Sequence, residues 1–424
     1  MDKLDQLVNI IGSFKYRKNT KEIEFLGFLS KDKDTYTLNA RADKSYLKEI
    51  DFEAPMTICG IISGIKITFF KAYMKNSRYR YEDDYFSMVL NPSKILIGIC
   101  CFEEPILKRI TLITSSINRM FNSSPIQLTC EPSGSEYQLL KTAPPIELNA
   151  QDKYGQLQVS QGFSTSFNRE EYRCNIVSYI NYSFNAPIPM TEAVARIASA
   201  NNLFSFFGNC YLPLNYFELC DTSDNADLVL FLNNTETKEY NDEAFLITSN
   251  VFSEKFNDIW NKWVGFYEES YIPTLFYEMV CNRSTGINRF LNLMQAIEIY
   301  SKKYRKNEAK LIAQKRNLAD SKKGVYLKHR VEDVFECFKS SFNINDDERM
   351  SISEKLANFR NLYTHYNETF TEPQYEVIFA ACHLLEFILL AIVYRHLGID
   401  DSAIMHIRTF SDFQRIDYWT KMLL

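Results

Sequence analysis

The residue types best suited to chemistry lie at 359–366, where the sequence reads FRNLYTHY. If this segment is helical, Asn361 and His365 are i,i+4 neighbours on one face, and Arg360 lies beside them. A histidine can take the proton of an attacking 2′-hydroxyl group or give one to a leaving 5′ oxygen. An arginine can hold the doubly charged phosphorane that forms in between. Arg360, Asn361 and His365 are therefore candidate catalytic residues for RNA cleavage without a metal ion.

The spacing by itself is weak support for a ribonuclease. The chain has five histidines, and about one arginine at four to six residues before a histidine is expected by chance in such a chain. A single histidine on a helix is also more often a hydrogen-bonded structural residue. On spacing alone, both interpretations of His365 stay open.

A block of positive charge precedes this segment. Between Lys302 and Arg330, eleven Lys or Arg stand against two acids, in a chain whose formal net charge is −5. Such a block in an acidic protein favours a phosphate-rich partner, although a solvated edge of helices would give the same pattern. The candidate RNA-binding residues are Lys302, Lys303, Arg305, Lys306, Lys315 and Arg316.

The sequence contains no motif for metal, redox, nucleotide-binding or serine-hydrolase chemistry. The ten cysteines are scattered and no C-x-x-C occurs, so neither a zinc ribbon nor a redox motif is expected. The histidines show no H-E-x-x-H spacing, and no Walker A, dinucleotide-binding or G-x-S-x-G pattern is present. We therefore expect no metal and no cofactor.

The first part of the chain is expected to be rich in β-structure, as a domain over 1–245. Runs of β-branched and aromatic residues between polar turns predict strands at 23–29, 56–70, 85–90, 95–102, 156–163, 175–182 and 228–232. Short alternating strands favour a sandwich or barrel over a parallel sheet. One inserted helix is predicted from Thr191, as its cap, to Gly208.

From about residue 250 the apolar residues recur at helical spacing. They predict helices around 256–267, 290–304, 331–338, 356–366 and 377–397. The expected fold is therefore α+β, with the β-rich domain followed by an all-α helical bundle over 250–424. The stretch 377–394 approaches the length of a membrane span, but His383 and Glu386 within it favour a helix buried in the bundle. With no signal-peptide pattern at the N-terminus, a cytoplasmic protein without membrane contact is expected.

The segment Arg360-Asn361-x-x-x-His365 resembles the R-x4–6-H signature of the HEPN ribonuclease superfamily, including the polar residue after the arginine. Its expected place near the start of a late helix in a four- to five-helix bundle is also similar to that family. The helix around 290–298 resembles another recurrent helix of the superfamily, in which an acid leans inward. By this resemblance Glu298 is a semi-buried partner of Arg360, while the alternative is an ordinary surface ion pair with Lys302.

The whole chain resembles the ApeA type of bacterial anti-phage protein, in which a β-rich domain precedes an Apea-like HEPN domain. The HEPN resemblance covers roughly 250–424, whereas the N-terminal one rests on strand order and the helix at 191–208. The resemblance implies a homodimer that brings two Arg360–His365 pairs into one cleft. It implies an endoribonuclease of abortive infection that leaves a 2′,3′-cyclic phosphate and a 5′-hydroxyl, with a tRNA anticodon loop as one possible substrate. The N-terminal domain would sense an unknown phage trigger or restrain the nuclease.

The sequence departs from some HEPN toxins at one position. Those proteins carry a tyrosine two residues after the histidine, where an antitoxin modifies it, whereas this chain has Asn367 there. Control by a nucleotidyltransferase antitoxin is therefore not expected. Two alternatives to a nuclease stay open: a non-catalytic HEPN module that binds RNA, and a scaffold for protein interactions.

Overall fold

The computed structural model divides the chain into two compact units. It describes residues 3–18, 21–51, 53–79, 83–121, 126–130, 138–142, 146–167, 172–223, 227–233, 245–281, 286–316, 324–339, 342, 344–365, 375–410 and 413–424. Unit 1 comprises 1–118, 123–201 and 213–240, and unit 2 comprises 119–122, 202–212 and 241–424. Helix α1 (Met190–Gly208) therefore contributes residues to both units.

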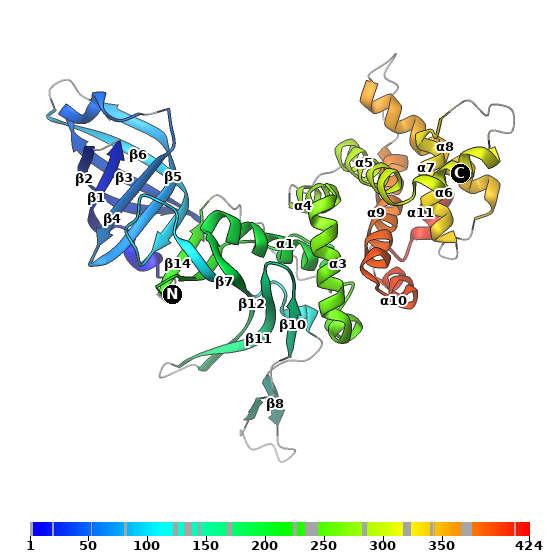
Figure 1. Cartoon of the computed structure of the whole chain (residues 1–424), viewed down its shortest axis with the longest axis horizontal. Coiled ribbons are helices and arrows are strands. Elements are labelled where there is room, and N and C mark those ends of the chain that lie inside the picture. Colours follow the sequence, from blue (N-terminus) through cyan, green and yellow to red (C-terminus); the bar gives the residue numbers. More distant parts are fainter. Residues whose placement is uncertain are drawn as a thin grey trace. The chain divides into compact units, whose positions relative to one another are not determined.

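Unit 1 contains a closed antiparallel barrel, drawn in blue and cyan in Figure 1. Its strands are β1 (Ile11–Lys18), β2 (Lys21–Asp32), β3 (Thr35–Asp43), β4 (Met56–Ile62), β5 (Ile65–Tyr79) and β6 (Tyr85–Ile97). They run in the order β6-β3-β2-β1-β4-β5, and β5 pairs back onto β6 to close the ring. Alternate side chains point inward, so that Ile23, Phe25 and Leu29 of β2 are buried in the barrel core. Of the sandwich or barrel predicted from the short alternating strands, the structure has the barrel.

Strand β6 connects the barrel to the rest of the sheet. Its first half pairs with β3 as far as Leu90, and its last residues, from Lys94, pair with β14 (Leu228–Leu232). Beyond β14 the sheet continues through β13 (Tyr216–Asp221), β7 (Ile106–Thr114), β12 (Tyr172–Pro189), β11 (Gly155–Phe167) and β10 (Glu147–Gln151). A separate ribbon pairs β8 (Ile126–Cys130) with β9 (Gln138–Thr142).

Some strand boundaries differ from those expected. The stretch 56–70 holds two strands, because Ser63 and Gly64 adopt positive φ values of 50° and 81° and turn the chain back between β4 and β5. Conversely, Pro92 does not end a strand, since β6 runs through it at the place where β6 changes partner from β3 to β14. The strand predicted at 95–102 is therefore the end of β6 and stops at Ile97.

The inserted helix α1 follows β12 directly and ends at Gly208, as predicted. Its start is different, because Met190 is already helical and Thr191 lies inside the first turn. Glu104 supplies the cap, accepting hydrogen bonds from the backbone N–H of Thr191 at 3.2 Å and from its hydroxyl group at 2.5 Å.

The described residues of unit 2 are helical apart from short connections (Figure 1). Its described helices include α2 (Ser249–Phe252), α3 (Phe256–Glu269), α4 (Ile272–Cys281), α5 (Gly286–Tyr304), α6 (Lys306–Arg316), α7 (Leu327–Cys337), α8 (Asp346–His365), α9 (Tyr375–Leu397), α10 (Asp401–His406) and α11 (Ile416–Met422). The five predicted helices correspond to α3, α5, α7, α8 and α9. Helix α6 was not predicted, because only Ala309 and Ala313 of its residues are buried and they make too short an apolar pattern.

Helix α9 forms the core of unit 2. By length and composition it could cross a membrane, yet 83% of its most apolar window is buried against other parts of the protein. It packs on α3, α5 and α11, and Gly398 ends it with a φ of +88°. The end of α1 adds to this core, since the ring of Phe206 stacks on Phe276 with centroids 3.8 Å apart.

Candidate functional site at the end of helix α8

Helix α8 begins well before the Arg-Asn-x-x-x-His segment. The side-chain oxygen of Asn345 accepts hydrogen bonds from the N–H groups of Asp347 and Glu348, both at 3.0 Å. The Glu348 carboxylate in turn accepts one from the N–H of Asn345 at 2.8 Å, which completes a capping box. The segment therefore occupies the last turns of a long helix, and the expectation that it lies near the helix start was wrong.

The apolar face of α8 holds its last turns against α5. Ile352, Leu356 and Tyr363 are buried on this face. The ring of Tyr363 meets that of Phe290 in α5 edge-on, with centroids 6.4 Å apart and planes at 79°. Because this contact lies close to the end of α8, it fixes the position of the helix end relative to α5.

Glu298 of α5 connects this helix to α8 through an ion pair. It lies beside the buried face of α5, and its side chain is 19% exposed. One carboxylate oxygen is 3.5 Å from a guanidinium nitrogen of Arg360, and the other is 2.6 Å from the ammonium group of Lys302. Both roles expected for Glu298 thus occur together, as the semi-buried partner of Arg360 and as the ion-pair partner of Lys302.

Arg360 has a single charged partner among the described residues. Its side chain is 31% exposed, and its contact with Glu298 is the one side-chain hydrogen bond or ion pair that it forms among the described residues. A guanidinium group has five N–H donors, so most of them remain available to a phosphate group. This arrangement suits an arginine that must meet a negatively charged ligand.

The structure describes the other two residues of the segment, Asn361 and His365, in less detail. Asn361 follows Arg360 on the exposed side of α8, and the Thr364 hydroxyl donates to the Arg360 carbonyl at 2.6 Å. His365 is the last residue of α8, and its side chain lies outside the described part of the structure. The backbone nevertheless makes Asn361 and His365 i,i+4 neighbours, as the sequence predicted.

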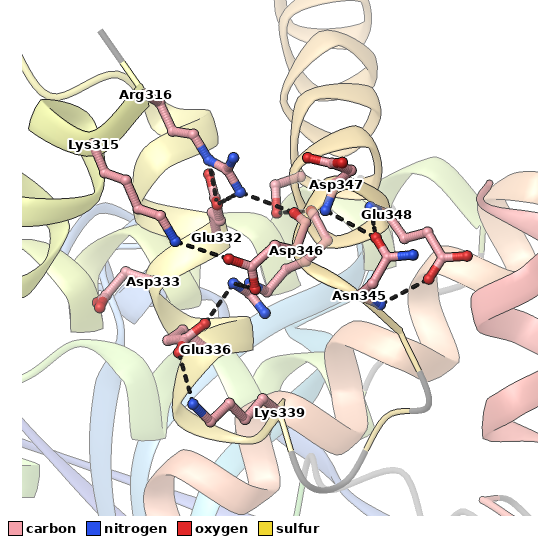
Figure 2. Close-up of polar contacts among 12 residues, drawn as sticks. Lys315, Arg316, Glu332, Asp333, Glu336, Lys339, Asn345, Asp346, Asp347 and Glu348 are labelled. Carbon is pink, nitrogen blue, oxygen red and sulfur yellow. Dashed lines mark hydrogen bonds and ion pairs between the residues drawn. The ribbon is translucent and has the colours of Figure 1, made fainter. Parts of the chain in front are cut away.

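Most of the described cations of the basic block (302–330) form ion pairs with acidic side chains of unit 2. Arg305 donates from two nitrogens to both oxygens of Asp333, at 2.8 and 2.9 Å. Arg316 donates twice to one oxygen of Glu332, at 2.9 and 2.7 Å (Figure 2). Both carboxylates are almost completely buried. The geometry therefore gives Arg305 and Arg316 a role in holding α7 in place, and it does not support the RNA contacts expected of them.

The same pattern continues at the N-terminus of α8. Asp346 accepts hydrogen bonds from Lys315 at 2.8 Å and from Arg349 at 2.7 Å, and these lower the pKa of Asp346 to about 2. Arg349 also pairs with Glu336 at 2.6 Å. Figure 2 shows these residues alternating in charge between α6, α7 and the start of α8. Lys315 is thus another predicted RNA-binding residue with a partner inside the unit.

The lysines at the start of the block are more open. Lys302 and Lys303 are exposed and pair with Glu298 and Glu269, the latter at 3.3 Å. Lys306 is exposed and has no ion-pair partner within the described ranges. Together with Arg360, these three lysines are the cations of the predicted set that form no ion pair with acids of α7 or α8 within the described ranges.

Among the residues that the structure describes, no three His, Cys, Asp or Glu side chains gather as they would to hold a metal ion. The site at the end of α8 therefore consists of a half-exposed arginine, its carboxylate partner, an exposed amide and nearby lysines. Fixed cations of this kind can bind a phosphodiester and stabilise negative charge that develops on it.

Two family models match the chain. The model of Apea-like HEPN domains matches residues 291–403, which include α5 from its second turn and all of α8. The model described as ApeA N-terminal domain 1 matches residues 9–263, more than half of the chain. No curated protein and no solved structure gives a match.

Proposed function

Because the chain belongs to the ApeA family and ends in an Apea-like HEPN domain, we propose that it is an endoribonuclease that needs no metal ion. The active site would form at the end of α8, around Arg360, Asn361 and His365. HEPN domains are a family of ribonucleases, which supports this class of reaction. The observation that carries the proposal for this chain is the half-exposed Arg360, set against α5 by the carboxylate of Glu298.

The reaction follows from the chemistry of these side chains. His365 takes the proton of a ribose 2′-hydroxyl, and the 2′ oxygen attacks the adjacent phosphorus. Arg360 donates hydrogen bonds to the phosphorane oxygens as their charge grows. The bond from phosphorus to the 5′ oxygen then breaks, and the leaving oxygen takes up a proton. The products are a 2′,3′-cyclic phosphate and a 5′-hydroxyl end.

Glu298 and Asn361 support these steps in the proposal. Glu298 fixes the direction of the Arg360 guanidinium, so that its donors are in place before the charge develops. Asn361 lies one helical turn before His365 and can orient the imidazole or hold a phosphate oxygen. Lys302, Lys303 and Lys306 extend positive charge along α5 and the start of α6, where the RNA backbone would lie.

A homodimer is part of the proposal, because one histidine cannot easily act on both sides of the same phosphate. Two copies of α8 across a two-fold axis would place His365 of the partner subunit where it can protonate the leaving oxygen. The substrate is proposed to be a structured RNA with an exposed loop, such as a tRNA anticodon loop, since unstacked nucleotides reach in-line geometry more readily. Following its family, the enzyme would act in anti-phage defence, with residues 1–245 sensing the trigger.

The test maps RNA ends in bacteria, with and without phage. Cells express the wild type, His365→Ala, Arg360→Ala or His406→Ala, the last being a matched change of an exposed histidine in α10. Discrete 5′-hydroxyl ends are expected in phage-challenged cells that carry the wild type or His406→Ala. Their yield should fall by about 10²- to 10⁴-fold when His365 is replaced.

If all four proteins protect the cells while none produces new RNA ends, catalysis at His365 is wrong. Crosslinking of RNA to the wild type and its loss in Arg360→Ala would then support the alternative of a non-catalytic module that binds RNA. Purified protein that cleaves tRNA equally well with and without EDTA would establish the independence from metal ions.

A further inference from the structure

We propose that a cavity between α5, α9 and α11 binds one unstacked base of the RNA substrate, an inference that rests on the proposed ribonuclease function. The cavity has a volume of about 760 Å³ and opens to solvent. It is lined by Arg289 of α5, by Tyr375, Glu376 and Phe379 of α9, and by Tyr418 and Trp419 of α11. The volume lies within the range of about 300–1,000 Å³ that is typical of small-molecule sites.

Aromatic rings form the walls of this cavity. The ring of Trp419 lies parallel to that of His383, with centroids 5.5 Å apart and planes at 14°. Phe379 meets Trp419 edge-on at 5.4 Å. Tyr375, Phe379 and Tyr418 are more than half exposed, an unusual state for neighbouring large rings in a folded protein. Their faces match those of nucleic-acid bases, all of which stack on aromatic side chains.

Polar groups in the lining also fit a nucleotide. The indole N–H of Trp419 is buried and has no acceptor among the described residues, whereas a buried indole N–H normally has one. This unpartnered donor belongs to a ring of the cavity wall. Arg415 is exposed, forms no ion pair within the described ranges and could meet a phosphate group.

Arg289 has a different role in the wall. It pairs with the buried carboxylate of Glu386, which also accepts a hydrogen bond from Asn209 at 2.9 Å. This pairing holds the side chain in place and balances its charge. Arg289 therefore shapes the cavity, and the phosphate contact falls to Arg415.

The cavity lies next to the end of α8. Phe290, which contacts Tyr363 in the last turns of α8, directly follows Arg289. Tyr363 also lies close enough to Tyr375 for the two phenols to interact electrostatically. A base in the cavity would thus belong to a nucleotide close to the cleaved bond. Helix α11 lies beyond residues 291–403, so the family match does not cover this wall.

Glu376 gives the cavity a preference among bases. Its carboxylate accepts hydrogen bonds, so it favours a base with an exocyclic amino group, such as adenine or cytosine. Uracil has no exocyclic amino group, and its single N–H on this edge lies between two carbonyl oxygens that a carboxylate repels. We therefore expect the cavity to select adenine or cytosine over uracil.

The experiment uses the full chain carrying His365→Ala, so that binding is measured without cleavage. Its intrinsic fluorescence is titrated with the hexanucleotides A₆, C₆ and U₆. Of the three tryptophans, Trp260 and Trp263 are buried and Trp419 lines the cavity, so quenching should be lost in Trp419→Phe. Affinity for A₆ should fall by about tenfold or more in Phe379→Ala. Tyr271→Ala, a change at an exposed tyrosine outside the cavity, should bind as the parent does.

Glu376→Gln separates base selection from stacking. The parent should bind A₆ and C₆ about tenfold more tightly than U₆, and Glu376→Gln should lose most of this preference while it still binds. Unchanged affinity in Phe379→Ala, with no quenching at Trp419, would overturn the inference. So would a change of sedimentation from dimer to monomer in Phe379→Ala at unchanged RNA affinity, because the cavity would then belong to a subunit interface. The outcome does not depend on whether the wild type cleaves RNA.

Discussion

Two arginines of unit 2 show how differently the same side chain can be placed. Arg305 donates hydrogen bonds to both oxygens of Asp333, whose side chain is 3% exposed. Arg360 lies 3.5 Å from one carboxylate oxygen of Glu298, whose other oxygen pairs with Lys302. The first arginine compensates a buried charge and has no donors to spare for a ligand in that direction. The second has a partner that orients it and leaves it half exposed.

The difference separates a stabilising cation from one that can act on a ligand. A dense block of positive charge points to a phosphate-rich partner only if its charges remain unpaired in the fold. In this chain the block's cations Arg305, Lys315, Arg316 and Lys328 are paired with acids of α7 and α8, while the isolated Arg360 is not saturated. Depth of burial and geometry of the partner, rather than charge density, distinguish the two.

The largest expected effect concerns stability. Arg305→Met leaves Asp333 buried without its partner, which should lower the unfolding free energy of unit 2 by about 3–5 kcal/mol. Arg360→Met should change it by less than about 1 kcal/mol, because Glu298 is partly solvated and keeps Lys302. All three tryptophans lie in unit 2, so fluorescence during urea unfolding reports on this unit. Recovery in the double variant Arg305→Met/Asp333→Leu would confirm the cause, and equal losses in both single variants would remove the distinction.

For RNA cleavage we expect the opposite order: a change at Arg360 should cost more activity than a change at a paired arginine of the basic block. Arg360→Lys keeps the charge but loses the planar fork of donors, and we expect RNA cleavage to fall by about 10²-fold. Arg316→Lys should leave the cleavage rate within about twofold, because Arg316 faces Glu332 and not the ligand. Single-turnover cleavage of a labelled tRNA measures both. Equal losses in the two lysine variants would mean that α6 takes part in the site.

A smaller effect concerns pH. Burial lowers the pKa of His329, and its Nδ1 accepts a hydrogen bond from the N–H of Tyr326 at 3.2 Å, which requires the neutral ring. The unfolded chain then binds more protons than the folded one between the lowered pKa and the ordinary value of 6.5. The unfolding free energy of unit 2 should therefore fall as the pH drops below about 6.5, by up to roughly 1.4 kcal/mol per pH unit from this group. His329→Gln keeps an acceptor and should flatten the slope, whereas His406→Ala should not.

The smallest expected effect is on the salt dependence of RNA binding. Lys306→Ala should reduce the slope of log affinity against log salt by about 0.7, the contribution of one phosphate contact on single-stranded RNA. Lys315→Ala should leave the slope unchanged, because Asp346 already neutralises Lys315. Titrations of A₆ at several salt concentrations compare the two variants. A larger change for Lys315 would show that its pair with Asp346 opens when RNA binds.

Local patterns in the sequence predicted most of the elements that build the site. The apolar residues recurring from Phe290 to Tyr304 marked α5, and Glu298 lies beside its buried face in the structure. The types and spacing of Arg360, Asn361 and His365 likewise followed from residues close in sequence. Such features depend on helical periodicity, which a single sequence displays.

Contacts between distant residues were not predictable in the same way. The pairing of Arg305 with Asp333 depends on how α7 packs, although the acids at 332, 333 and 336 directly follow the basic block and signal neutralisation. The start of α8 was set too late, because Asn345 and Glu348 form their capping box ahead of any apolar stripe. The wall that α11 adds to the cavity had no sequence signal, since only a short apolar pattern marks this helix.

The position of α9 in the chain also sets when the nuclease unit can fold during synthesis. The helices that pack on it include α3 and α5, which leave the ribosome long before it does. Until residues 375–397 have emerged, these helices lack the surface on which they bury their apolar faces. The strands of the barrel in unit 1 are complete by residue 97, and its core takes its last residues, Val229 and Phe231, from β14, so it can form while translation continues. A partly translated chain therefore acquires its β-barrel first, and a nascent polypeptide that stops short of α9 carries an Arg360 without the core that aligns it.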